Sequence, residues 1–130
     1  MAMEKRFVLL LAVLLALQSL VAATPGTATY YTEYTPSACY GYKNKGTMIA
    51  AASRRIYANG AACGRRYSVR CTGPTNAGVP HPCKGTSVVV TIVDLCPSPG
   101  CQATLDLSQE AFAAIADLNA GKIKIDYTQV

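Results

Sequence analysis

Six cysteines constrain this chain more than any other feature, because an even number in a short exported chain is typical of a disulfide framework. We therefore expect three disulfides, which stabilise a small domain by restricting its unfolded state. A zinc site is the alternative, but no Cys-x-x-Cys pair occurs, and the single histidine, His81, lies between two prolines in a predicted loop. We predict no metal and no cofactor. The cysteines are Cys39, Cys63, Cys71, Cys83, Cys96 and Cys101.

Residues 1–23 have the pattern of a secretory signal peptide. Basic residues precede an apolar run, and small residues that end at Ala23 mark a cleavage site. A membrane anchor is the alternative, but Gln18 and Ser19 interrupt a run already shorter than the roughly 20 residues that span a bilayer. We therefore expect cleavage after Ala23 and a secreted domain over residues 24–130 with no membrane span.

The expected domain is basic. Removal of the leader lowers the formal net charge from +5 to +4, which favours association with acidic polymers such as the pectin of a plant wall. The basic clusters, Arg54–Arg55 and Arg65–Arg66–Arg70, are too short and scattered for a nucleic-acid interface. We predict no nucleic-acid partner.

Strand patterns dominate the chain. Alternation of apolar and polar side chains predicts half-buried strands at residues 66–71 and 122–130. The nearly continuous β-branched run at 87–95 predicts a central strand that is buried on both faces. A first strand is expected at 26–31, and the segment 72–85, rich in proline and glycine, indicates a loop.

Two helices are expected between these strands. Residues 48–57 are rich in alanine and are followed by a stop at Asn59–Gly60. Ser108 is a favourable N-cap, Glu110 lies in the first turn where the helix dipole favours a negative charge, and Gly121 should end this second helix. Strands with short helices and three disulfides predict a small, closed, mostly β barrel.

Two carboxylates are the candidates for chemistry, Asp94 and Asp106. Asp94 would continue the apolar face of Val90 and Ile92 to the end of its strand, where it either borders a groove or hydrogen-bonds a loop. Asp106 lies just before Ser108, so helix amides should stabilise its charge and lower its pKa unless burial overrides them. Glycoside hydrolases use two carboxyl groups about 5–9.5 Å apart, so this pair is the one to consider for sugar cleavage.

Five motifs, in their order along the chain, resemble the double-psi β-barrel domain shared by expansins, barwin-type proteins and family-45 endoglucanases. The resemblance covers residues 26–130. Within that superfamily the chain is most similar to the endoglucanase-45-like single-domain proteins of plants, which include the plant natriuretic peptides and the citrus blight-associated protein. The resemblance implies a six-stranded double-psi β-barrel. The motifs are GTATYY, NGAACGRRYSVRC, SVVVTIVDLCP, TLDLSQEAF and AGKIKIDY.

The resemblance also implies a groove formed by Tyr31, Asp94 and Asp106. Asp106 in TLDLS matches the aspartate of the expansins' HFD motif, Asp94 in VDLCP matches their groove aspartate, and Tyr31 in ATYY matches the aromatic residue of ATFYG. Thr104 stands where HFD has histidine, and Glu33 is only a loose positional counterpart of the endoglucanases' catalytic base. The resemblance therefore implies a non-catalytic relative, and we assign no catalytic residue.

The disulfide pairing expected from the resemblance to expansins joins cysteines that are neighbours in sequence, and the loops it encloses are compatible with the predicted strands. Arg66 stands where expansins have a further cysteine, so their longer bridge should be absent. The expected bridges are Cys39–Cys63, Cys71–Cys83 and Cys96–Cys101.

Two functions follow from the resemblance. The first is an extracellular protein of the natriuretic-peptide type that acts in water and solute homeostasis or stress signalling, with residues 39–70 as its active stretch and a plasma-membrane receptor as partner. The second is a monomeric, expansin-like binder of cell-wall polysaccharide or weak wall-loosening factor in the apoplast. A barwin-like defence activity is a third analogy. Because the chain has no tryptophan, sugar stacking would fall to tyrosines, namely Tyr30, Tyr31, Tyr34, Tyr40 or Tyr42.

Overall fold

The computed structural model describes residues 22–130. All of the predicted signal peptide except Ala22 and Ala23 lies outside the described residues, so its cleavage stays a prediction. Over the described part of the chain, no helix is long and apolar enough to cross a membrane.

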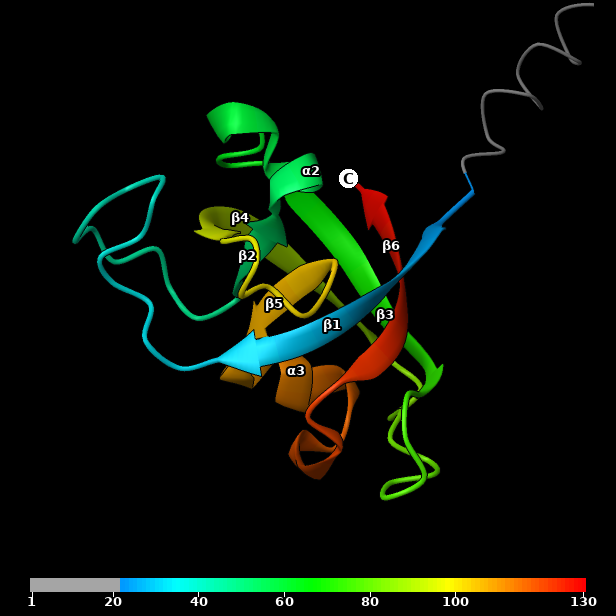
Figure 1. The fold of residues 1–130 in the computed structure, drawn as a ribbon. Coiled ribbons are helices and arrows are strands. Elements are labelled where there is room, and N and C mark those ends of the chain that lie inside the picture. The colour runs from blue at the N-terminus through cyan, green and yellow to red at the C-terminus, as the bar shows by residue number, and fades with distance from the viewer. Residues whose placement is uncertain (1–21) are drawn as a thin grey trace, which may run out of the picture.

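Six strands close into a barrel within the described residues, as expected (Figure 1). Their order around the barrel is β1-β5-β2-β4-β3-β6. The pairs β1/β5 and β2/β4 are parallel, and the other four pairs are antiparallel. The strands are β1 (Thr24–Tyr31), β2 (Ile49–Ser53), β3 (Arg66–Pro74), β4 (Ser87–Cys96), β5 (Leu105–Ser108) and β6 (Ile123–Gln129).

The helices are short and lie between strands. They are α2 (Arg54–Tyr57) and α3 (Gln109–Ile115), with 3-10 turns η1 (Ala58–Gly60) and η2 (Leu118–Ala120). The predicted cap of α3 is confirmed, because the Ser108 hydroxyl accepts a hydrogen bond from the Ala111 amide over 3.0 Å. Phe112 of α3 is fully buried and packs against Tyr30 of β1, with ring centroids 4.9 Å apart. The helix therefore helps to close the barrel core.

The helix predicted over residues 48–57 is wrong for most of its length. Its alanines form β2, and only Arg54–Tyr57 is helical. Helix propensity favours alanine by only a fraction of a kcal/mol per residue, whereas β2 gains backbone pairing on both sides, to β4 and β5. Ala50 and Ala52 are fully buried because their small side chains fit the barrel interior.

The second predicted helix is shorter than expected. It ends at Ile115 rather than at Gly121, which instead ends η2 with a φ of 68°. The cause is competition for the backbone: the Lys84 amide donates to the Ile115 carbonyl and the Asp117 amide to the Pro82 carbonyl, both over 2.9 Å. These bonds pull the chain after α3 out of the helix.

The remaining strand predictions are confirmed with changes at their ends. β3 continues to Pro74, so the predicted loop begins at residue 75. β4 is not buried on both faces throughout, since Val89 is 37% exposed and only its later part, at Ile92 and Val93, buries consecutive side chains. β5 was not predicted, because a strand of four residues has too short a pattern to recognise.

All six cysteines are paired in the described structure. The bridges are those expected, Cys39–Cys63, Cys71–Cys83 and Cys96–Cys101. The first ties the loop of residues 32–48, hereafter the β1–β2 loop, to the chain just before β3. This loop projects from the barrel on the left of Figure 1.

Candidate functional site

A row of side chains crosses four strands on the outer face of the barrel. Thr29 of β1 is opposite Asp106 of β5, Asp106 is opposite Ala51 of β2, and Ala51 is opposite Asp94 of β4. Residues on either side of Ala51 and Asp106 in the sequence are fully buried in the core, so the row faces outward. We call Asp94, Ala51 and Asp106 the acidic row.

Asp94 reaches this row through a break in strand register. Ala50 is opposite Ile92 but Ala51 is opposite Asp94, so Val93 is the extra residue of a bulge. The prediction that Asp94 continues the face of Val90 and Ile92 is therefore wrong, because those two side chains lie in the core. The bulge turns Asp94 to the opposite face, where it lies on the same side as Asp106.

The Asp94 carboxylate anchors the β1–β2 loop. Its Oδ1 atom accepts hydrogen bonds from the amides of Ala38 and Leu95, both over 2.9 Å. The Cys39 amide adds a bond to the Val93 carbonyl over 3.0 Å. Together with the Cys39–Cys63 bridge, these contacts hold the loop against the row.

Asp106 is a strand residue rather than a helix-mouth residue, and its pKa is raised, which is the case in which burial overrides any stabilisation of its charge. Burial raises the pKa of its carboxyl most, the negative charge of Asp94 raises it further, and the hydrogen bond from Thr29 opposes both. That bond runs from the Thr29 hydroxyl to Oδ1 over 2.8 Å. The expectation of helix amides is wrong because Ser108, two residues later, caps α3.

Tyr31 lies beside both acids. Burial raises the pKa of its hydroxyl strongly, and Asp94, Asp106 and Tyr34 add to the effect. The hydroxyl oxygen is buried and has no hydrogen-bond partner among the described residues. The ring packs edge-on against Tyr34, with centroids 5.2 Å apart. The structure thus brings together the three residues that the resemblance named, and leaves a polar atom there without a partner.

Tyr34 and Glu110 extend this cluster. The Tyr34 hydroxyl donates to Glu110 Oε2 and accepts from the Gln109 amide over 3.1 Å. Burial, followed by the bond to Glu110, raises the pKa of the Tyr34 hydroxyl. Tyr34 was considered only for sugar stacking, and the role of Glu110 was missed. The sequence offers one signal for each residue: Tyr34 lies three residues after Tyr31, and Glu110 lies two residues after the N-cap Ser108.

Other candidates lie apart from the row. Tyr30 points into the barrel against Phe112, Tyr42 is 83% exposed, and Glu33 is exposed beyond the end of β1. His81 is exposed in its predicted loop. Over residues 22–130 no three His, Cys, Asp or Glu side chains gather as a metal site would require.

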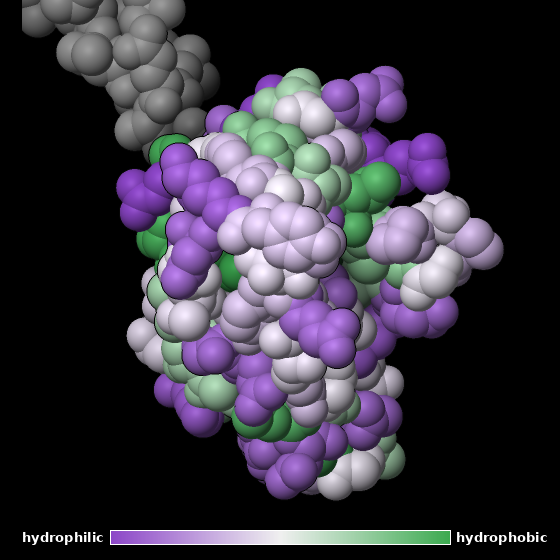
Figure 2. All heavy atoms as spheres, turned by 90° about the vertical axis from the view of Figure 1, so that its left-hand side faces the viewer, coloured by the Kyte–Doolittle hydropathy of each residue, from purple (hydrophilic) through white to green (hydrophobic). Residues whose placement is uncertain are grey.

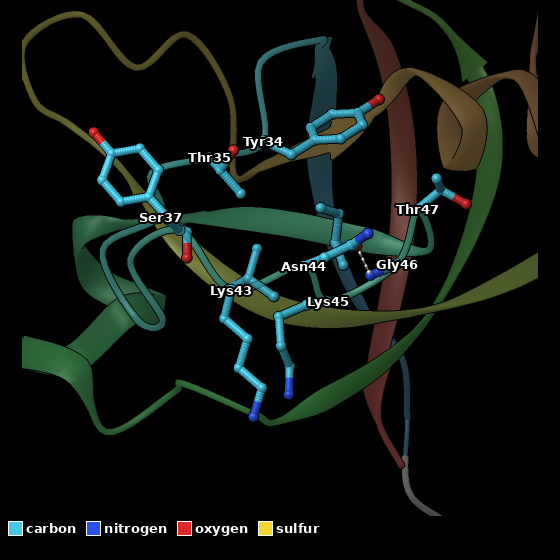
Figure 3. A pocket seen from close by; sticks show the side chains of 11 residues that line it. Tyr34, Thr35, Ser37, Lys43, Asn44, Lys45, Gly46 and Thr47 are labelled. Carbon is cyan, nitrogen blue, oxygen red and sulfur yellow. Dashed lines mark hydrogen bonds between the residues drawn. The ribbon is translucent and has the colours of Figure 1, made fainter.

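A cavity of about 340 Å³ adjoins the row without containing its acids (Figure 3). Residues of the β1–β2 loop form most of its wall, and Ile49 and Val93 form the rest. Tyr34 is shared between the cavity and the cluster around Tyr31. Sequence reasoning did not single out its basic and amide residues, Lys43, Asn44 and Lys45.

Comparisons with known proteins identify the family to which this barrel belongs. The family model described as lytic transglycolase matches residues 49–127. An EG45-like domain containing protein of Citrus jambhiri is 62% identical over 114 residues, covering 87% of this chain and 86% of that protein. An EG45-like domain containing protein of Arabidopsis thaliana is 57% identical over 125 residues, covering 96% and 98%.

Solved structures share the barrel. A mutant expansin of Clavibacter michiganensis in complex with cellohexaose is 33% identical, with a TM-score of 0.62, over 84% of this chain. The match spans 50% of that expansin chain. The family-45 endoglucanase EG27II in complex with cellobiose matches over 83% of this chain with a TM-score of 0.59, and at 19% identity it shows the fold alone. By these matches the chain belongs to the EG45-like domain containing proteins, a family of double-psi β-barrels related to expansins.

Proposed function

We propose that this protein binds a β-linked cell-wall polysaccharide along the acidic row and Tyr31 without cleaving it. The observation that carries the proposal is that two carboxylates on one outer face of the barrel, Asp94 and Asp106, lie beside the partly buried ring of Tyr31. Carboxylates accept hydrogen bonds from the hydroxyls of a sugar.

The aromatic residues at the site support a sugar as ligand. Tyr31 and Tyr34 pack edge to face and both are partly buried, so their rings are held in place. A held aromatic ring with a polar tip offers stacking area at little cost in conformational entropy. The expansin that shares this barrel was solved with cellohexaose, which favours a β-linked glucan as ligand here.

Binding without hydrolysis is the second part of the proposal. Asp106, with its raised pKa, has the property of a proton donor. Asp94 holds the backbone amides of Ala38 and Leu95 through Oδ1, and Glu33 is exposed beyond β1, so we assign neither as the base that activates water. A two-carboxylate mechanism lacks its base. Secretion to the apoplast, after removal of residues 1–23, and a monomeric state belong to the same proposal.

The proposal is tested by calorimetric titration of cellohexaose into the wild-type protein and two variants. Tyr31→Ala removes the ring, and Asp94→Asn keeps the acceptor for Ala38 and Leu95 while removing the charge. We expect each to weaken binding at least about tenfold, roughly the value of one lost stacking or charged hydrogen-bond contact.

A matched control is the double variant Arg54→Gln/Arg55→Gln, whose exposed side chains lie on α2, outside the acidic row. It should bind as the wild type does. A reducing-sugar assay with soluble β-glucan should detect no turnover. Unchanged affinity of folded Tyr31→Ala and Asp94→Asn would contradict the binding site, and turnover that Asp106→Asn abolishes would contradict the absence of hydrolysis.

Signalling of the natriuretic-peptide type is the second candidate. It is favoured by the exposed arginines of residues 39–70, since Arg54, Arg55 and Arg66 enter no ion pair within the described chain. The same stretch supplies β2 and the first half of β3, so its shape depends on the barrel. Solute flux in plant cells should then fall with Arg54→Gln/Arg55→Gln and persist with Tyr31→Ala. The opposite pattern would exclude this candidate.

A further inference from the structure

The cavity beside the acidic row continues the outer face of β2. Ile49, in its wall, lies two residues before Ala51 on the same strand and faces the same way. At its other side Tyr34 lines the cavity and contacts Tyr31. A ligand on the acidic row that extends past Tyr34 therefore enters the cavity.

Lysines give one side of this cavity a positive charge. Lys43 and Lys45 both line it and extend side by side from the β1–β2 loop, with their ammonium groups at the end away from Tyr34 (Figure 3). The Lys45 ammonium lies 4.4 Å from the centroid of the Tyr40 ring, a cation–π contact that helps to hold it. Over residues 22–130 the one ion pair found is between Arg70 and Asp126, so neither lysine is neutralised by a carboxylate.

The loop that carries the lysines is anchored. Asp94 accepts from its Ala38 amide, and the Cys39–Cys63 bridge fixes its middle. Asn44 Oδ1 accepts from the Gly46 amide over 2.8 Å, which shapes the turn between the two lysines. The face from which the loop projects has mostly hydrophilic and weakly polar colouring with small, separate hydrophobic areas (Figure 2). It suits a polar ligand more than an apolar partner.

We propose that this cavity is a subsite for the carboxylate of a uronic acid. Resting on the proposed glycan binding, the inference names the ligand as a neutral β-linked glycan that carries occasional uronic acid units. Asp94 and Asp106 repel a carboxylate placed over them, so the sugar unit on the acidic row is neutral. Lys43 and Lys45 attract the carboxylate of the next sugar unit, which lies in the cavity. At about 340 Å³ the cavity is within the usual range of roughly 300–1,000 Å³ for small-ligand sites.

The expected gain is moderate. Both lysines are exposed to solvent, so each should contribute about threefold to affinity, and the pair about tenfold, at low ionic strength. Screening should remove most of this gain at about 0.5 M salt.

The test compares two ligands that differ only in charge. A xylo-oligosaccharide bearing one glucuronic acid, and the same oligosaccharide with its carboxyl reduced to an alcohol, are titrated into the full protein. We expect the wild type to prefer the acidic form by about tenfold. Lys43→Gln/Lys45→Gln should remove the preference and bind the reduced form as before. Lys122→Gln/Lys124→Gln, the same charge change at the start of β6, should keep the preference.

The outcomes separate this inference from the function on which it rests. Binding of the reduced form without any preference for the acid would overturn the uronate subsite and leave the glycan site intact. A preference that survives Lys43→Gln/Lys45→Gln would also overturn it, as would tighter binding of oligogalacturonate, in which every unit is charged. Failure of both xylo-oligosaccharides and cellohexaose to bind would overturn both.

Discussion

Asp106 ionises where its charge is disfavoured, because burial and Asp94 both raise its pKa. A folded-state pKa above the unfolded value means that the native protein holds the proton more tightly. The contribution of the Asp106 carboxyl to stability is therefore complete below its unfolded-state pKa. It is lost as the pH rises from the unfolded-state pKa to the folded-state pKa. Asp106→Asn keeps an acceptor for Thr29 and removes the charge. We predict a higher melting temperature than wild type at about pH 7, and no difference at about pH 3.

Thermal melts across that pH range check this prediction, with Asp126→Asn as the control. Asp126 forms a solvent-exposed ion pair with Arg70, so its loss should give no gain at neutral pH. If Asp106→Asn melts below wild type at neutral pH, the carboxylate charge is stabilised after all, as the helix-mouth hypothesis held.

Tyr31 and Tyr34 provide a second contrast at the level of single residues. Tyr31→Phe removes a buried hydroxyl that has no partner in the described chain, so the free energy of unfolding should be unchanged or higher by about 1 kcal/mol. Tyr34→Phe breaks hydrogen bonds to Glu110 and Gln109 and should lower it by about 1–2 kcal/mol. Urea denaturation measures both, and a larger loss for Tyr31→Phe would show that its hydroxyl has a structural partner.

Strand β2 depends on small side chains. Ala50 is fully buried in the core, so Ala50→Leu should overpack the barrel and lower the free energy of unfolding by about 1–3 kcal/mol. Ala114→Leu, on the exposed side of α3, adds the same atoms and should be nearly neutral. Denaturation curves of the two variants test this prediction. Equal losses in the free energy of unfolding would contradict the position of Ala50 inside the barrel.

The three disulfides should differ in their contribution according to the loops they close. Sequence separations of 24, 12 and 5 give chain-entropy estimates of about 3.4, 2.8 and 2.1 kcal/mol for Cys39–Cys63, Cys71–Cys83 and Cys96–Cys101. Paired Cys→Ala variants, measured by denaturant unfolding, should lose stability in that order. The reverse order would mean that native contacts, not loop closure, set their value.

At the level of elements, local signals were predictable and tertiary ones were not. Ser108 as N-cap and the alternation of β6 are encoded within a few residues, and both are present. β2 is a strand only because β4 and β5 pair with it. Its alanines favour a helix locally, so the sequence pattern predicted the wrong element. The early end of α3 depends on the loop at Cys83, which lies distant in sequence.

At the scale of the whole molecule, barrel closure assembles the site from segments far apart in sequence. The resemblance supplied Tyr31, Asp94 and Asp106, but the bulge that turns Asp94 outward depends on the register between β2 and β4. The cavity was unpredictable for the same reason, since it needs the β1–β2 loop to lie against Ile49 and Val93. The protein thus presents an acidic row next to a basic cavity, an arrangement its net charge of +5 does not reveal.

The central claim is that a β-linked glycan lies on the acidic row. An amide-resolved NMR titration of the ¹⁵N-labelled protein with cellohexaose tests it most directly, because Ala38 and Leu95 report on Asp94 through their hydrogen bonds. We predict that the largest shift changes occur at these two amides and around Thr29 and Asp106, with little change at Arg54 and Arg55. Changes confined to the α2 side, or none at saturating glycan, would contradict the account.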